Sequence, residues 1–128
     1  MRRVAPALVD VAAVVLFVAI GRSSHHHQET IRGFLSTAWP FAVGLVVGWV
    51  LSARGGLWRS RAGIIVCSAT VAVGMVLRVV AGQGTAWSFI LVALAFLGAV
   101  MLLGRTLARW ALRLADREAS PAPAAPDR

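Results

Sequence analysis

Four long apolar runs, each almost free of charged side chains, take up most of this chain. They cover about residues 4–21, 34–53, 62–81 and 86–104. A helix needs about 20 apolar residues to cross the ~30 Å hydrocarbon core of a bilayer, and only a helix or a closed barrel satisfies its backbone there. The runs therefore predict an all-α fold in which residues 1–104 form a domain of four membrane-spanning helices.

These runs leave little polar surface, and the composition excludes a soluble domain. Hydrophobic residues make up 59% of the chain and charged residues 14%. A soluble domain of this size would need more polar side chains to cover its surface. All 13 basic residues are Arg, and the net charge is +8. Because these Arg residues lie at the ends of apolar runs, they favour the lipid bilayer over nucleic acid as a partner.

The distribution of Arg also predicts the orientation in the membrane. Arg residues are concentrated at residues 1–3, in the connection 54–61 and after residue 104. The connections 22–33 and 82–84 carry fewer of them. Since short cytoplasmic segments carry the excess of Arg, we expect a multi-pass protein of the cell membrane with both termini in the cytoplasm.

A short phrase occurs twice in the chain. Thr37–Phe41 reads Thr-Ala-Trp-Pro-Phe and Thr85–Phe89 reads Thr-Ala-Trp-Ser-Phe, and each opens an apolar run. Each copy also follows an apolar run with an Arg at or near its end, Arg22 in the first case and Arg78 in the second. Both halves would enter the membrane from the same side. We therefore predict a bundle built from two parallel helix–loop–helix repeats, related by an axis along the membrane normal.

The repeat predicts a candidate binding site at the outer face of the bundle. Two guanidinium groups would lie there beside hydroxyl donors and aromatic rings, a combination that suits a carboxylate or a phosphate. The alternative is that both Arg side chains reach lipid headgroups and that the Trp rings are ordinary interface anchors. The candidate ligand-binding residues are Arg22, Arg78, Thr37, Trp39, Thr85, Trp87 and Ser88.

Asp10 is the only acidic residue within the four runs. An acid inside a membrane span is by default a functional candidate, here for coupling to protons or ions. The alternative is a structural carboxylate that accepts a hydrogen bond from Ser68 or Trp49, or that reaches Arg residues of the inner side. Position along the runs predicts no Arg at the depth of Asp10, unless residues 2–3 or 54–61 fold back onto it.

The pattern changes after residue 104. In residues 105–118 the apolar side chains of Leu107, Trp110 and Leu114 share one helical face, and Arg recurs every fourth position on another. This spacing predicts a cytoplasmic amphipathic helix on the membrane surface, bound to anionic lipid headgroups. The Ala- and Pro-rich residues 119–128 predict a disordered tail.

Metal and catalytic signatures are weak in this sequence. The consecutive residues His25–His27 cannot share one helical face, and a solvated loop is the preferred interpretation over a pH-responsive lid or a weak metal site. No Ser/His/Asp set, paired carboxylates, glycine-rich phosphate loop or zinc-ligand spacing is visible. We therefore expect no enzyme activity, no metal and no cofactor.

Polar residues at fixed points in the apolar runs carry a family resemblance. They are Asp10, Gly21–His25, Thr37–Phe41, Gly44, Gly48–Trp49, Arg78, Gly82–Thr85 and Ser88–Phe89. With these residues the chain resembles a family of small actinobacterial membrane proteins catalogued as domain of unknown function 3054. The resemblance covers about residues 4–104 and implies a four-helix integral membrane protein. It brings no activity, ligand or cofactor with it.

Two classes of function fit these features. One is a small transporter or channel-like protein for an anionic or polar solute, which we expect to work as a homo-oligomer because four helices enclose little volume. The other is a non-transporting membrane scaffold or accessory subunit. The residues of the outer pocket distinguish the two, because only the first class needs a ligand there.

Overall fold

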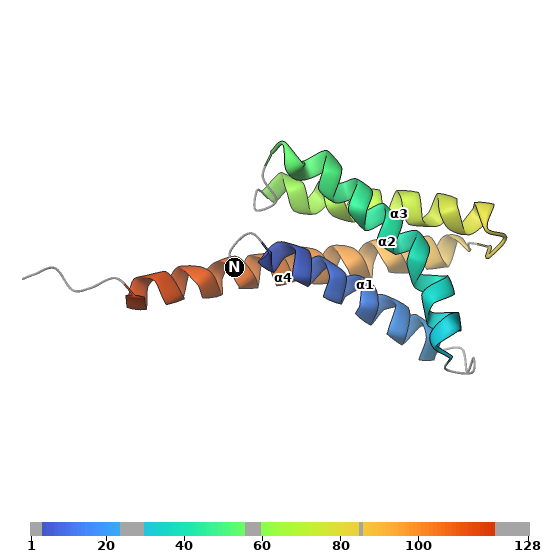
Figure 1. The fold of residues 1–128 in the computed structure, drawn as a ribbon, viewed down its shortest axis with the longest axis horizontal. Coiled ribbons are helices and arrows are strands. Elements are labelled where there is room, and N and C mark those ends of the chain that lie inside the picture. Colours follow the sequence, from blue (N-terminus) through green and yellow to red (C-terminus); the bar gives the residue numbers. More distant parts are fainter. Residues whose placement is uncertain (1–3, 24–29, 56–59, 85, 120–128) are drawn as a thin grey trace, which may run out of the picture.

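The computed structural model describes residues 4–23, 30–55, 60–84 and 86–119. Within these ranges all regular secondary structure is helical, which confirms the all-α prediction. The helices alternate in direction, so that α1 begins at the end of the bundle where α4 leaves it (Figure 1). They are α1 (Ala5–Ser23), α2 (Ile31–Ala53), α3 (Ser60–Val80) and α4 (Trp87–Ala119).

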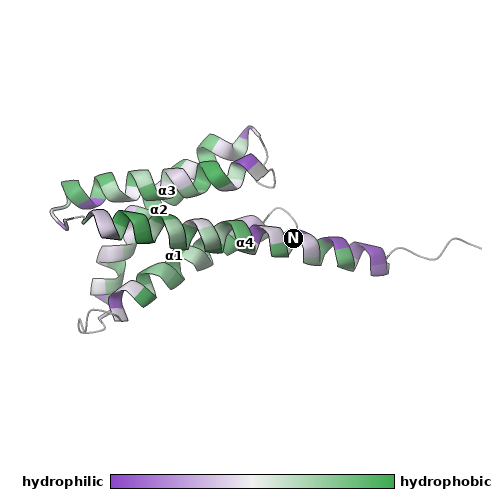
Figure 2. Cartoon of the chain, turned by 180° about the vertical axis from the view of Figure 1, so that it is seen from behind, coloured by the Kyte–Doolittle hydropathy of each residue, from purple (hydrophilic) through white to green (hydrophobic). Residues whose placement is uncertain are grey.

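All four helices are long and apolar enough to cross a membrane. Only 17–39% of the most apolar stretch of each helix is buried inside the protein. The remainder exposes many Val, Leu and Ile side chains, and the hydropathy colouring shows apolar residues along the length of the bundle (Figure 2). Exposed apolar surface of this extent is matched by acyl chains rather than by water. Together these features suggest a multi-pass membrane protein.

The closest packing in the bundle is between α2 and α3. A Cβ atom added at Gly44 would lie 2.7 Å from the carbonyl oxygen of Thr70, and one added at Gly48 would lie 2.8 Å from Cα of Val66. Both glycines are buried on the same side of α2, four residues apart. Small residues at this spacing allow two helix backbones to touch. In a bilayer the hydrophobic effect does not drive helices together, so such close packing is a common basis of their association.

The helices form a ring in which each contacts two neighbours. α1 packs on α2 and α4, and α3 packs on the same two helices. The core includes a cluster of phenylalanines: the ring of Phe17 lies 5.4 Å from that of Phe41, 5.6 Å from Phe89 and 5.7 Å from Phe96, measured between centroids. Such edge-on and tilted pairs add about 0.5–1.5 kcal/mol each to the burial of their surface. The cluster joins α1, α2 and α4.

The last helix continues past the predicted end of the fourth span. α4 has 33 residues and therefore a length of about 50 Å, against ~30 Å for the hydrocarbon core of a bilayer. Residues 105–118 are helical as predicted, but they extend the same helix. Arg105 is still buried in the bundle, and the later residues leave it at one end (Figure 1). The sequence placed a boundary at Gly104, where the helix has no break. One glycine costs a helix only about 1 kcal/mol relative to Ala, which is too little to end it.

Candidate functional site

A cavity opens at the end of the bundle where α3 passes into α4, called here the Gly82 end. α1 and α4 diverge toward this end (Figure 1). The cavity has a volume of about 680 Å³, within the range of small-molecule sites. It is lined by Phe17, Ile20 and Gly21 from α1, Arg78 from α3, Gln83 and Gly84 from the connection, and Ala86, Ser88, Phe89, Val92 and Phe96 in or just before α4.

Arg78 is the only charged side chain among the residues that line this cavity. It lies in the last turn of α3, and its guanidinium carbon is 4.9 Å from the centroid of the Phe89 ring. The negative face of the ring attracts the cation. Nε of Arg78 is buried and has no hydrogen-bond partner in the described part of the chain. An unpaired buried donor costs about 1–3 kcal/mol. Nε itself is closed to solvent, so an anion in the cavity would meet the other N–H groups of this half-buried side chain.

The turn after α3 holds the backbone of Arg78 in place. The amide of Gln83 donates to the carbonyl of Arg78 at 2.9 Å, and the amide of Gly82 donates to Val79 at 3.0 Å. This pair of bonds is the Schellman motif that ends many helices, and it requires the left-handed conformation that Gly82 adopts at φ 69°. The Gln83 side chain also donates to the carbonyl of Ser36 on α2, at 2.9 Å. The connection between α3 and α4 is thereby joined to the first turns of α2.

The other Arg of the predicted pair, Arg22, lies elsewhere. Its Nη1 atom donates to the carbonyl of Gly33 at 3.1 Å and to the hydroxyl of Thr37 at 3.3 Å. The Thr37 hydroxyl itself donates to the same carbonyl at 3.0 Å. Thr30 caps this helix by accepting from the amide of Gly33. Arg22 and Thr37 thus join the end of α1 to the first turns of α2, and neither lines the cavity.

The remaining predicted residues divide in the same way. Ser88 lines the cavity beside Arg78. Trp39 and Trp87 do not, and they are 41% and 82% exposed, as suits interface anchors. Thr85 lies outside the described residues. The structure therefore brings Arg78 and Ser88 together and adds residues that the sequence did not single out, chiefly Phe17, Phe96 and Gln83.

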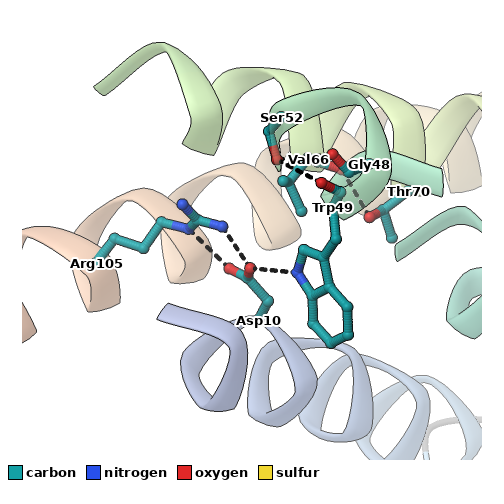
Figure 3. Close-up of polar contacts among 7 residues, drawn as sticks. All are labelled: Asp10, Gly48, Trp49, Ser52, Val66, Thr70 and Arg105. Atoms are coloured by element: carbon teal, nitrogen blue, oxygen red, sulfur yellow. Dashed lines mark hydrogen bonds and ion pairs between the residues drawn. The ribbon is translucent and has the colours of Figure 1, made fainter. Parts of the chain in front are cut away.

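A second polar centre lies at the other end of the bundle and contains Asp10 (Figure 3). Asp10 is fully buried and Arg105 is 4% exposed. Nε of Arg105 donates to one carboxylate oxygen of Asp10 at 2.9 Å, and Nη2 donates to the other. Nε1 of Trp49 also donates to that second oxygen, at 3.0 Å. The carboxylate therefore accepts hydrogen bonds from two helices while it belongs to a third.

The expectation that no Arg lies at the depth of Asp10 is wrong. Arg105 reaches it because α4 continues beyond Gly104 and runs antiparallel to α1. A Cβ at Gly104 would lie 2.6 Å from Cγ1 of Val9, so the glycine allows the two helices to approach closely just before Arg105. The hydrogen bond from Trp49 agrees with the structural alternative for Asp10. Its coupling to protons or ions stays a prediction, and this geometry lends that prediction no support.

Two buried hydroxyl groups near this centre are satisfied within their own helices. Ser52 donates to the carbonyl of Gly48 at 2.8 Å, and Thr70 donates to the carbonyl of Val66 at 2.7 Å (Figure 3). Such bonds to the preceding turn are the usual arrangement for a hydroxyl on a buried helix face. These side chains are therefore not offered to a ligand.

Metal binding has no candidate among the described residues. Within the ranges that the structure covers, no three His, Cys, Asp or Glu side chains gather closely enough to hold an ion. The residues His25–His27 lie outside those ranges. The solvated loop expected for this run stays a prediction, with the pH-responsive lid or weak metal site as its alternatives. The disordered tail also stays a prediction, because only Ala119 of it is described.

Comparison with known proteins places the chain in a family. The family model described as Protein of unknown function (DUF3054) matches residues 7–108, most of the chain, so the protein belongs to this family. The match includes both Asp10 and Arg105, as well as the cavity residues. No curated protein and no solved structure matches the chain.

Proposed function

We propose that this member of the DUF3054 family is a small transporter or channel-like protein of the cell membrane that binds an anionic solute through Arg78. One observation carries the proposal. The buried Nε of Arg78 has no partner in the described part of the chain, at the wall of a cavity with no acidic lining residue. Guanidinium binds carboxylates and phosphates through paired N–H donors, and burial strengthens that interaction.

The proposed orientation makes the cavity open to the outside. The Asp10 end carries most of the Arg residues, including Arg54, Arg61 and those of the α4 extension beyond Gly104. The positive-inside rule then assigns this end to the cytoplasm. The Gly82 end faces outward, with Trp39 and Trp87 exposed at the interface. The parallel-repeat interpretation is consistent with this assignment, because both copies of the Thr-Ala-Trp phrase lie at the Gly82 end.

A transport cycle needs a second state that opens at the cytoplasmic end. The buried contact of Asp10, Arg105 and Trp49 lies at the Asp10 end, and we propose that it closes this end in the present state. The cavity is therefore accessible from one end, as in one half of an alternating-access cycle. Four helices enclose little volume, and a homo-oligomer would extend the enclosed path.

The alternative function is a non-transporting scaffold or accessory subunit, and one feature favours it. The α4 extension exposes Leu107 and Trp110 beside Arg109 and Arg113, a surface suited to anionic lipid headgroups or to a partner subunit. A scaffold of this kind would use the extension and would need no ligand at Arg78. We propose no enzymatic step for either function.

Replacement of Arg78 tests the proposal. The purified protein is reconstituted in liposomes, and uptake and binding of a panel of carboxylates and phosphates are compared for wild type, Arg78→Gln and Arg32→Gln. Arg32 is an exposed residue at the same end and does not line the cavity, so its substitution removes the same charge without altering the pocket. We expect loss of anion binding in Arg78→Gln alone. Equal behaviour of the two variants would leave the scaffold as the better function.

A further inference from the structure

We infer that the ligand of the Arg78 cavity is an anionic amphiphile, in which one carboxylate or phosphate head is joined to an aliphatic chain. The inference rests on the proposed function, because it takes Arg78 as the anion-binding group. The new element is the aliphatic chain that is joined to the anionic head.

The cavity has one cationic point and a mainly apolar wall. Apart from Arg78, its side chains are chiefly those of Phe17, Phe89, Phe96 and Val92. A small hydrated anion would cover Arg78 and leave these surfaces facing water. An aliphatic chain covers them, and each buried methylene strengthens binding about fourfold, since its transfer is worth ~0.8 kcal/mol.

The polar groups of the cavity are gathered at one end. Arg78 is in the last turn of α3, and Ser88 is in the first turn of α4, both at the Gly82 end. Phe96 follows Ser88 by eight residues on α4, or about 12 Å of helix rise toward the middle of the bundle. A ligand with its head at Arg78 would therefore extend its apolar part along α4 to Phe96.

The head carries a net negative charge and needs few other contacts. None of the residues that line the cavity is acidic, so nothing there repels an anion. The Arg78 guanidinium carbon lies over the Phe89 ring, 4.9 Å from its centroid, and its N–H groups suit paired binding of an anionic head group. The Gln83 amide uses one of its two N–H groups on Ser36, and the Ser88 hydroxyl is a further side-chain donor in the lining.

Such a molecule reaches the cavity from two sources. A single-chain amphiphile, such as a long-chain carboxylate, partitions from water into the outer leaflet. An anionic diacyl phospholipid is already there. Both present the shared chemistry, an anionic head at the interface and an aliphatic chain below it. The experiment separates them by varying the bilayer.

The test uses the full-length protein in nanodiscs of zwitterionic phosphatidylcholine. Binding of acetate, octanoate, laurate and the neutral analogue dodecanol is measured by displacement of a fluorescent fatty acid. We expect affinity to rise steeply from acetate to laurate, and laurate to bind at least tenfold more tightly than dodecanol. Arg78→Gln should remove the preference for laurate over dodecanol, and Arg32→Gln should keep it. Val92→Trp, which fills the apolar part, should weaken the binding of laurate.

The outcomes separate this inference from the function on which it rests. If acetate and laurate bind equally well and both need Arg78, the cavity takes small anions, and the amphiphile inference fails while the proposed function stands. If no anion binds, or if Arg78→Gln changes nothing, both fail. Nanodiscs with anionic phosphatidylglycerol distinguish the sources. Weaker laurate binding there identifies the diacyl lipid as a competing occupant, and unchanged binding identifies the single-chain amphiphile.

Discussion

Arg105 and Asp10 are 95 residues apart in the sequence, and their side chains form a two-point ion pair that is buried among α1, α2 and α4. Removing two charges from water is costly, and a buried pair of this kind adds little net stability over well-packed apolar residues. Loss of one partner is a different matter, because the other charge then stays buried alone. The pair therefore determines which substitutions at this end of the bundle are tolerated.

Asp10→Asn should destabilise the bundle strongly. The amide keeps the size of the carboxyl but leaves the Arg105 guanidinium without a counter-charge, which costs about 3–5 kcal/mol when one partner of a buried pair is removed. The measurement is the unfolding free energy in micelles or bicelles. Glu118→Gln, an exposed acid on the same α4 helix as Arg105, is the matched control. Equal stability of the two variants would show that the pair is not buried as described.

The double variant Asp10→Leu with Arg105→Met should recover stability that each single variant loses. Removing both charges leaves no unpaired group, and apolar replacement of a buried pair is typically neutral or stabilising by about 1–4 kcal/mol. A double-mutant cycle measures the coupling directly. Additive losses, with no recovery in the double variant, would contradict a direct interaction between the two side chains.

Gly44→Ala should separate α2 from α3. The added methyl would meet the carbonyl oxygen of Thr70 at 2.7 Å, and backbone cannot move aside as a side chain can. We expect a loss of about 1–3 kcal/mol, as for overpacked cores. Gly21→Ala is the control: nothing lies within 4 Å of its added methyl, and alanine should stabilise α1 by about 0.5–1 kcal/mol. The measurement is the midpoint of thermal unfolding of both variants. Similar midpoints for Gly44→Ala and Gly21→Ala would argue against direct backbone contact at Gly44.

Arg22→Ala should loosen the start of α2 without abolishing ligand binding. Arg22 donates to Gly33 and Thr37 and does not line the cavity. Hydrogen exchange measured by mass spectrometry should become faster in the first turns of α2, while the affinity for an anion stays within about twofold, well under the 1.4 kcal/mol of a tenfold change. Arg32 is exposed in the first turn of α2, and Arg32→Ala should alter neither the hydrogen exchange nor the anion affinity. A loss of anion binding in Arg22→Ala would return Arg22 to the site, as the repeat predicted.

The proposed orientation is tested by single-cysteine labelling. In a Cys67→Ala background, His26→Cys and Gly56→Cys are treated with a membrane-impermeant maleimide from outside the cell. Position 26 should react and position 56 should be protected, because the positive-inside rule assigns the connection 54–61 to the cytoplasm. The reverse labelling pattern would show the opposite membrane orientation, with the Arg78 cavity on the cytoplasmic side.

The four helices were predictable because each apolar run has the length of a membrane span and needs no partner to be recognised. The partners of Asp10 were not, because they depend on where α4 ends and on which helices are neighbours. Gly104 and the Arg spacing after it indicated a boundary, yet the structure holds Arg105 inside the bundle beside Asp10. Local pattern does not contain that tertiary contact.

The candidate site was predictable in part for the same reason. The repeat named Arg78 and Ser88 together, and both line the cavity, because both lie close to the short connection 82–84. It gave Arg22 an equivalent role, but Arg22 meets the carbonyl of Gly33 and the hydroxyl of Thr37, and Arg78 meets the ring of Phe89. Phe17 lines the cavity from α1, and no spacing pattern in the sequence indicates that it lies there.

α4 is one continuous helix that extends well beyond Arg105 in both directions. Trp87 lies about 27 Å from Arg105 along the axis on one side, and Ala119 about 21 Å on the other. The ion pair with Asp10 holds the helix between these ends. If α4 tilted about that contact, the cavity residues and the extension beyond Gly104 would move in opposite directions, which would tie the width of the cavity to the position of the extension.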